Sequence, residues 1–169
     1  PGSEGLFFLP YLSGERTPYP DPNARGTFFG LTMRHNKRHL VRAVLEGVAY
    51  SLHDSIELFR SLNVPITQVR ATGGGARSRV WRQILADVFG TELATVNVTD
   101  GSAYGAALLA GVGAGVYASV PEACAQTVKI VDVVEPVPEN CRAYDAYYPV
   151  YRSLYPALKP AFDAIAEIT

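Results

Sequence analysis

The longest hydrophobic pattern in the chain is that of an amphipathic helix from about Lys37 to Leu62. Asn36 precedes it and is of a residue type that commonly caps a helix N-terminus. Gly47 lies mid-helix, where glycine costs about 1 kcal/mol relative to alanine, so we expect close packing there. Apolar residues recur at helical spacing, at Val41, Val44, Leu45, Val48, Leu52, Ile56 and Phe59.

Shorter patterns predict strands and helices in alternation along most of the remaining chain. Apolar or aromatic runs predict strands at Leu6–Pro10, Thr27–Leu31, Gln68–Thr72 and Glu92–Val98. Helical spacing predicts helices over Ala76–Phe89, from Gly101 onward, and after a Ser119 cap. Such alternation favours an α/β fold with some parallel strand pairing.

The C-terminal part, from Glu139 onward, combines aromatic residues at near-helical spacing with three prolines. Pro149, Pro156 and Pro160 interrupt the pattern, so we expect linked or kinked helices that pack against the domain. This surface would also allow a homodimer. The aromatic residues are Tyr144, Tyr147, Tyr148, Tyr151, Tyr155 and Phe162.

The segment from Gly101 to Pro121 has no charged residue and is long enough to span a bilayer. It consists mainly of glycine and alanine, which contribute little to membrane insertion but allow close helix packing. We therefore predict a buried helix of a globular protein, with Gly101/Gly105 and Gly111/Gly115 as packing points.

Composition narrows the classes of function. The 169 residues are 48% hydrophobic and 18% charged, which predicts one globular domain over residues 1–169. The net charge of −1 provides no basic surface for nucleic acid or an anionic membrane.

Cys124 and Cys141 lack metal-ligand spacing, and their number favours a reducing, cytoplasmic setting. The start at Pro1-Gly2-Ser3, without methionine, suggests a piece of a longer protein.

Three successive glycines, Gly73, Gly74 and Gly75, lie between a predicted strand and a predicted helix. Glycine lets the backbone turn sharply and approach a ligand, and free N–H groups at a helix start attract phosphate. The turn is therefore a candidate nucleotide-phosphate site, and the alternative is a tight turn without a ligand.

Two familiar nucleotide motifs fit this turn poorly. Gly73-x-Gly75-x-x-Ser78 approaches the dinucleotide pattern, but Ser78 replaces the third glycine and Glu92 precedes the next strand. A P-loop would require a Gly-Lys-Ser/Thr sequence, which does not follow.

Other polar residues provide no catalytic set. His35 and His39 lack the glutamate of a zinc helix, and His53 stands alone on a long helix. We expect Asp54 and Glu57 to face solvent. No acid/base pair, Ser/His/Asp set or metal site is predicted.

Four blocks of sequence follow one another along almost the whole chain: Leu9–Pro18 with Asp21–Leu31, then Arg42–Ala49, then Thr72–Asp87, then Gly105–Ala107. In this order they resemble the FGGY family of carbohydrate kinases. Within that family, the loop Ser13–Pro18 is most similar to the xylulose kinases.

The resemblance implies the C-terminal half of a two-domain kinase, with an α/β, actin-like ATPase (ribonuclease H-like) fold in which helices flank a mixed sheet. By position, Gly73, Gly74 and Gly75 would contact the ATP phosphates, and Ser78, where relatives often have asparagine, would lie near the ribose or adenine. Mg²⁺ would bind through the phosphates. The family's catalytic aspartate and most sugar contacts belong to the other domain, so we expect this chain alone to be inactive.

Two alternatives to a kinase remain open. The chain could be a non-catalytic, actin-like interaction domain, or, more distantly, a dinucleotide-binding dehydrogenase domain. For the loop Glu15–Pro18, a structural or interdomain role is favoured over direct substrate contact.

Overall fold

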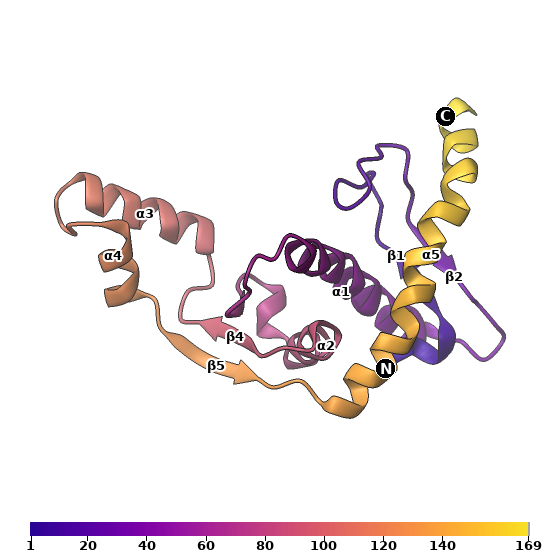
Figure 1. The fold of residues 1–169 in the computed structure, drawn as a ribbon, viewed down its shortest axis with the longest axis horizontal. Coiled ribbons are helices and arrows are strands. Elements are labelled where there is room, and N and C mark those ends of the chain that lie inside the picture. The colour runs from indigo at the N-terminus through magenta and orange to yellow at the C-terminus, as the bar shows by residue number, and fades with distance from the viewer. Residues whose placement is uncertain (169) are drawn as a thin grey trace. The chain divides into compact units, whose positions relative to one another are not determined.

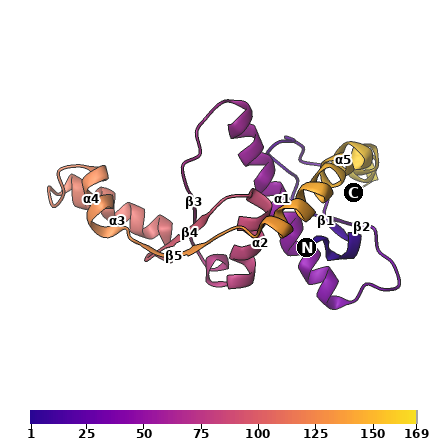
Figure 2. The same ribbon diagram turned by 60° about the horizontal axis from the view of Figure 1, so that its bottom comes forward.

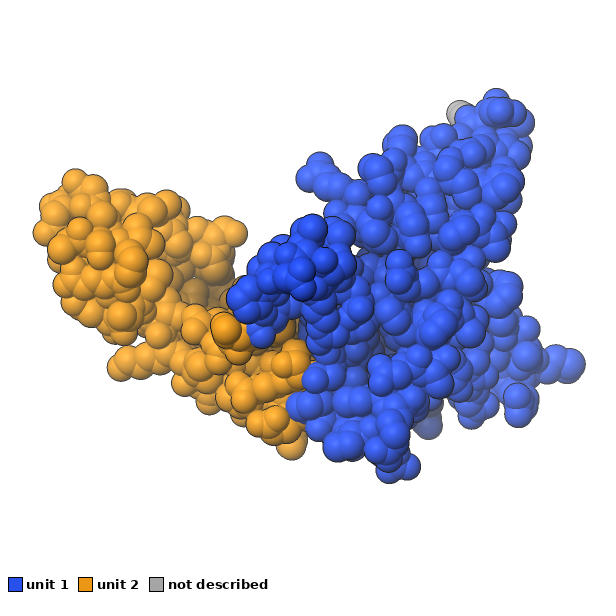
Figure 3. All heavy atoms as spheres, viewed as in Figure 1, with its two compact units in different colours: residues 1–66, 87–90, 136–169 blue, residues 67–86, 91–135 orange. Residues whose placement is uncertain are grey.

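The computed structural model describes residues 1–168, which form two compact units (Figures 1 and 3). Unit 1 comprises Pro1–Ile66, Asp87–Gly90 and the chain from Pro136 onward. Unit 2 comprises Thr67–Ala86 and Thr91–Glu135. The assignment of one domain to residues 1–169 stays a prediction.

Unit 1 is built around two strands and two long helices (Figure 1). The strands pair antiparallel, with Phe7 opposite Phe29. Leu6 and Phe8 form a small apolar core with Ala43 of the first helix. The elements are β1 (Phe7–Leu9), β2 (Thr27–Phe29), α1 (Lys37–Ser61) and α5 (Pro138–Ile168).

Helix α1 begins and ends within one residue of the predicted bounds. The Asn36 side chain accepts a hydrogen bond from the Arg38 N–H, and the His39 ring accepts one from the Asn36 N–H. A Cβ added at Gly47 would lie 2.0 Å from the Phe8 carbonyl oxygen, which confirms the predicted close approach. Glycine therefore lets α1 contact the β1 backbone.

The buried face of α1 is polar or small rather than aliphatic. Glu46, Tyr50, His53 and Asp54 are buried, and the expectation that Asp54 faces solvent is wrong. They alternate at helical spacing with Ala43 and Gly47, so they share one side of the helix. The residues that first indicated the helix lie mostly on the opposite side.

Glu46 is the centre of the polar contacts in unit 1, with only 2% of the residue exposed. The Gly2 N–H donates to its carboxylate at 3.0 Å and the Ser3 hydroxyl at 2.8 Å. Arg42 Nε donates at 2.7 Å and the Tyr144 hydroxyl at 2.8 Å. One carboxylate therefore joins the N-terminal turn, α1 and α5.

Helix α5 continues through Pro149, Pro156 and Pro160 as one helical span, so the predicted separate helices do not form, whereas a kink within the helix stays a prediction. A proline removes an N–H donor and crowds the preceding turn, which disfavours an isolated helix. Tyr144, Tyr151, Leu154, Tyr155 and Phe162 are buried along it, so tertiary packing compensates for these local costs.

Unit 2 contains a mixed three-stranded sheet in the order β3-β4-β5. The β3–β4 pair is parallel and the β4–β5 pair is antiparallel. No strand was predicted at β5, and all of its residues except Val134 are exposed. The elements are β3 (Val69–Ala71), α2 (Arg79–Phe89, which continues into unit 1), β4 (Leu93–Val96), α3 (Gly101–Gly113), α4 (Val120–Thr127) and β5 (Ile130–Val134).

Helix α3 forms where predicted, but it is not a buried helix. Leu108 is its single buried residue, and α3 contacts α4 (Figure 2). A Cβ on Gly105 would meet no atom of the described chain within 4 Å. Close packing therefore does not explain why position 105 is a glycine. None of the helices within residues 1–168 combines enough length and hydropathy to cross a membrane.

We predict opposite effects for alanine at two mid-helix glycines. Gly47→Ala should lower the free energy of unfolding by about 1–3 kcal/mol, because the methyl group would overlap the Phe8 carbonyl oxygen. Gly105→Ala should raise it by about 0.5–1 kcal/mol, because its Cβ is unobstructed. Urea denaturation measures both changes, and equal effects would contradict the packing described for α1.

We predict that Glu46→Ala lowers the free energy of unfolding by about 3–5 kcal/mol, since it leaves buried donors without their acceptor. Glu57→Ala on the same helix is the control, because the Glu57–Arg60 ion pair is half-exposed and such pairs contribute about 1 kcal/mol or less. Similar losses for the two variants would refute a central role for Glu46.

Candidate functional site

The glycine turn joins β3 to α2 in unit 2. Gly73 has a φ of 84°, a left-handed conformation that side chains other than glycine rarely adopt. A 3-10 turn follows at Gly75–Arg77, and α2 starts at Arg79. The predicted start of this helix, Ala76, lies three residues earlier, within the 3-10 turn.

The three glycines have different surroundings. A Cβ on Gly75 would contact the Trp81 indole nitrogen at 3.2 Å. A Cβ on Gly74 would meet nothing within 4 Å among the described residues, and Gly74 has an ordinary φ of −61°. Of the three positions, only position 73 requires glycine for its backbone conformation. The space beside the Gly74 Cα is open.

Two neighbouring hollows of unit 2 share Thr72, Gly73, Arg77 and Thr99. One lies over the sheet and is also lined by residues of β4 and β5, including Thr95 and Asp132. The other extends to the start of α3, where it is lined by Asp100, Gly101 and Ser102. The site therefore collects the ends of two parallel strands and a helix N-terminus.

Charge at the first hollow comes mainly from arginine. Arg82 donates to the Asp132 carboxylate at 2.5 Å, and this hydrogen bond holds the pKa of Asp132 below its usual range. The buried Nε of Arg82 has no hydrogen-bond partner within residues 1–168. Arg77 lines both hollows. Cationic side chains and backbone N–H groups suit an anionic ligand.

The helix start at the second hollow is capped from within the chain. The Asp100 side chain accepts from the Ala103 N–H at 3.4 Å. The first backbone N–H groups of a helix have no partners within that helix. Among residues 1–168, no cluster of histidine, cysteine, aspartate or glutamate could hold a metal ion. The arrangement is suited to binding rather than to acid/base chemistry.

The predicted site residues occupy one turn, but their roles differ. Gly73 lines both hollows, whereas Gly74, Gly75 and Ser78 lie in the turn beside them. The Ser78 hydroxyl accepts from the Trp81 N–H at 3.3 Å, so it caps α2. Sequence reasoning did not include Thr72, Arg77, Thr99 or Asp100 in the site. The Thr99-Asp100-Gly101 sequence before α3 was the available signal.

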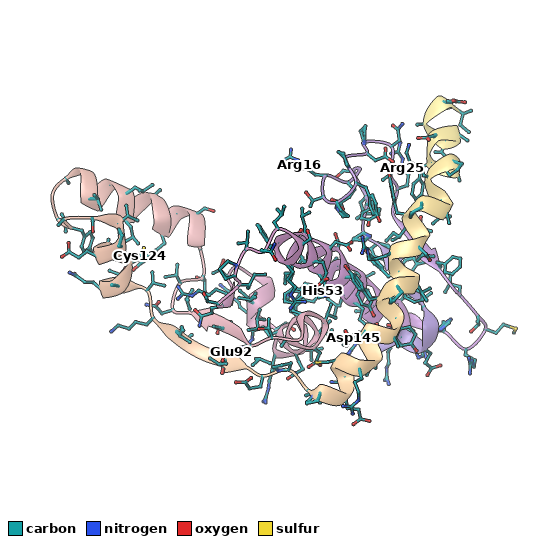
Figure 4. All side chains as sticks on the ribbon, in the orientation of Figure 1. Arg16, Arg25, His53, Glu92, Cys124 and Asp145 are labelled. Atoms are coloured by element: carbon teal, nitrogen blue, oxygen red, sulfur yellow. The ribbon has the colours of Figure 1, made fainter. Side chains whose placement is uncertain are left out.

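The loop between β1 and β2 is held against α5. The Glu15 carboxylate accepts from the backbone N–H groups of Arg16 and Thr17. Tyr19 stacks on Tyr155 with 4.0 Å between ring centroids. The exposed Arg16 projects from this loop, as Figure 4 shows. These contacts support the structural role expected for Glu15–Pro18.

Asp21 anchors the same loop. Its carboxylate accepts from the Tyr155 hydroxyl at 2.8 Å and lies 3.5 Å from the Lys159 amine. The Tyr155 hydrogen bond is the main reason that the pKa of Asp21 is lowered. Burial and the same hydrogen bond raise the pKa of Tyr155 to about 12.

A second polar cluster lies between α1 and α5, where Figure 4 labels His53. The Tyr148 hydroxyl donates to Asp54 Oδ1 at 2.6 Å, and Arg152 Nε lies 3.5 Å from the same atom. Asp54 Oδ2 and His53 Nδ1 have no hydrogen-bond partner within residues 1–168. Burial raises the pKa of Asp54 and lowers that of His53.

The architecture resembles that of nucleotide-binding α/β proteins. A mixed α/β unit places a glycine turn and a helix start at the ends of parallel strands, as in nucleotide-binding proteins. The sequence profile of the "FGGY family of carbohydrate kinases, C-terminal domain" matches residues 1–114. The chain belongs to the FGGY family of carbohydrate kinases, whose members are ATP-dependent phosphotransferases.

Individual relatives cover nearly the whole of this chain. The xylulose kinase of Staphylococcus epidermidis is 39% identical over 99% of the chain and 34% of its own length. The gluconokinase of Bacillus subtilis is 38% identical over 99% of the chain and 33% of its own length. The chain therefore spans about one third of the relatives that it matches.

Solved structures establish the fold. The gluconate kinase from Lactobacillus acidophilus has a TM-score of 0.85 and 34% identity over 97% of this chain and 33% of its own. The ligand-bound xylulose kinase from the same organism has a TM-score of 0.82 and 32% identity over the same shares. The predicted α/β, actin-like ATPase fold is confirmed.

The raised pKa of Asp54 predicts a pH dependence of stability. The folded chain holds the Asp54 proton more tightly than the unfolded chain, so this stabilisation is complete below about pH 4 and is lost as pH rises through the folded pKa. Asp54→Asn does not titrate and keeps an acceptor for Tyr148. We expect the variant to gain stability relative to the wild type between pH 4 and pH 7.

Urea denaturation at several pH values measures this difference. Protonation of His53 at low pH lowers the free energy of unfolding of both proteins. This contribution therefore largely cancels when the two free energies are subtracted. A difference that shrinks as pH rises would contradict the assignment.

Proposed function

We propose that this chain forms the nucleotide-binding part of an ATP-dependent carbohydrate kinase of the cytoplasm. The observation that carries the proposal is the turn at Gly73, whose left-handed backbone lies between two hollows at the ends of parallel strands. Backbone N–H groups in such a turn bind phosphate without an intervening side chain. The FGGY membership supports ATP as the phosphate donor.

In this proposal the glycine turn holds the phosphates of ATP. Gly73, Gly74 and Gly75 allow close approach, and Arg77 supplies positive charge. Ser78 lies at the start of α2, near the place expected for the ribose or adenine, and its hydroxyl also caps the helix. Mg²⁺ would accompany ATP through the phosphate oxygens, where it neutralises charge during transfer.

The proposed reaction transfers the γ-phosphoryl group of ATP to a sugar hydroxyl, with D-xylulose as the preferred substrate. The similarity of the Ser13–Pro18 loop and of several relatives to xylulose kinases supports D-xylulose, whereas D-gluconate is the second candidate. The family resemblance assigns the base that deprotonates the sugar to a portion outside this chain. Catalysis by such kinases rests mainly on positioning and charge stabilisation.

We predict that Gly74→Val weakens binding of Mg-ATP by about tenfold or more, because its side chain would occupy the space proposed for phosphate. The fold should tolerate this change, since a Cβ at Gly74 meets no described atom within 4 Å. Gly113→Val is the control, because it is an equally unobstructed position at the far end of α3. Calorimetric titration of each 169-residue variant measures the affinity.

Wild-type and Gly113→Val chains should bind with the same affinity. Equal affinity of Gly74→Val and the wild type would contradict the proposed phosphate site.

We also predict that the 169-residue chain does not phosphorylate D-xylulose, because the family resemblance assigns the base for the sugar hydroxyl to a portion outside this chain. A coupled assay with Mg-ATP and D-xylulose tests this expectation, with the S. epidermidis xylulose kinase as positive control. Turnover by the chain at a rate similar to that of the control would refute the assignment of the base to another portion.

A further inference from the structure

Residues 98–100 join β4 to α3 and form one wall of the two hollows in unit 2. Thr99 lines both hollows, Val98 lines the first and Asp100 lines the second. A Cβ on Gly101, the first residue of α3, would lie 3.4 Å from the Thr72 hydroxyl oxygen. The wall therefore lies against the strand end that leads into the glycine turn.

Regular secondary structure ends before this wall begins. Strand β4 ends at Val96, and its register with β5 shifts between Thr95 and Val96. Residues 98–100 belong to neither a strand nor a helix. A segment without ladder or helix hydrogen bonds opens more readily than its neighbours unless other contacts hold it. The contacts of Asn97, which lies between β4 and the wall, therefore determine how firmly the wall is held.

Asn97 is hydrogen-bonded to the connection between α4 and β5. Its backbone N–H donates to the Lys129 carbonyl oxygen at 3.0 Å. Its side-chain carbonyl oxygen accepts from the Lys129 N–H at 2.8 Å. Its side-chain amide donates to the Thr127 carbonyl oxygen at 3.0 Å, across 30 residues of sequence. One asparagine therefore continues the attachment of this segment to its neighbour beyond the register shift.

The side chain of Asn97 is exposed, yet both its carbonyl oxygen and its amide bind the protein backbone. Thr127 is the last residue of α4, and the last carbonyl groups of a helix have no partner within that helix. Asn97 itself lines neither hollow, whereas Val96 and Val98 on either side of it line the first. Any effect of Asn97 on a ligand is therefore indirect.

We propose that Asn97 is a positioning residue of the nucleotide site, which holds Thr99 and Asp100 beside the glycine turn by attaching them to the end of α4. The proposal rests on the proposed function, because Mg-ATP is taken as the ligand of the hollows. Alanine at position 97 would lose both side-chain hydrogen bonds. An ordinary hydrogen bond changes an equilibrium constant by a factor of about 2–10, so this loss is large enough to release the wall in part.

A role limited to the stability of α4 is the alternative, and Ser119 provides the matched control. The Ser119 hydroxyl accepts from the Glu122 N–H at 3.3 Å and caps the other end of the same helix. Ser119→Ala therefore weakens α4 without removing a contact of the wall.

Asn97→Asp is a second test variant, needed if Asn97→Ala does not fold. It has the same shape and keeps an acceptor for the Lys129 N–H, but it places a carboxylate oxygen against the Thr127 carbonyl oxygen. Both Asn97 variants should therefore release the wall.

The first measurement is nitrogen-15 relaxation of the 169-residue chain without nucleotide. Both Asn97 variants should lower the order parameter of the Thr99 N–H from its wild-type value toward the range below about 0.6 that is typical of flexible backbone. Ser119→Ala should leave it unchanged. Wild-type order parameters at residues 98–100 in both Asn97 variants would overturn the proposal, whether or not the chain binds nucleotide.

The second measurement is calorimetric titration of the same proteins with Mg-ATP. Both Asn97 variants should bind about fivefold more weakly or worse than the wild type, and Ser119→Ala should stay within about twofold of it. Equal weakening by Asn97→Ala and Ser119→Ala would mean that only the stability of α4 matters, which overturns the proposal.

Gly74→Val separates this proposal from the proposed function. Wild-type affinity of both Asn97 variants, together with weakened binding by Gly74→Val, would overturn the role of Asn97 and leave the phosphate site intact. Wild-type affinity of Gly74→Val, together with weakened binding by the Asn97 variants, would instead contradict the phosphate site and support a role for the wall in binding.

Discussion

The buried carboxylate of Glu46 is the interaction on which unit 1 depends. A carboxylate removed from water is costly unless hydrogen bonds replace its hydration, and here donors from Gly2, Ser3, Arg42 and Tyr144 do so. Three segments that are distant in sequence must therefore meet at one atom group. The need for these donors fixes the rotation of α1, and that rotation explains both the contact of Gly47 with β1 and the exposure of the aliphatic side.

Unit 2 depends on a backbone constraint instead. The left-handed Gly73 ends β3 and turns the chain toward α2, which leaves the turn beside open hollows rather than beneath side chains. Recognition by main-chain N–H groups is insensitive to most side-chain changes, provided that the glycine conformation is kept. In the proposed role, such a site would hold phosphate through its backbone without supplying a group that removes a proton from a substrate.

Local signals predicted much of the fold. The Asn36 cap and the recurring apolar residues located α1, and the mid-helix Gly47 predicted its close contact. Within the site, the glycine turn was predicted, but Thr99 and Asp100 were not included because the pairing of β3 with β4 brings them near it. A pairing between distant strands has no local signature.

The errors came from tertiary contacts that outweigh local preferences. Three prolines predicted linked or kinked helices after Glu139, whereas buried tyrosines hold this segment in one helical span. Aspartate is usually a surface residue, but Asp54 accepts a hydrogen bond from the Tyr148 hydroxyl inside unit 1. The small residues of α3 indicated burial, yet Leu108 alone is buried there. Burial of a polar residue depends on partners elsewhere in the chain, so periodicity could not identify it.

The similarity of this chain to kinases named for two different substrates bears on what the segment does. A xylulose kinase and a gluconokinase match it over 99% of its length at 39% and 38% identity. A segment that distinguished a neutral ketose from a sugar acid would need a charged partner in one case and not in the other. Nearly equal similarity to both agrees with the proposed role of holding the nucleotide, which is a task that the two named activities would share.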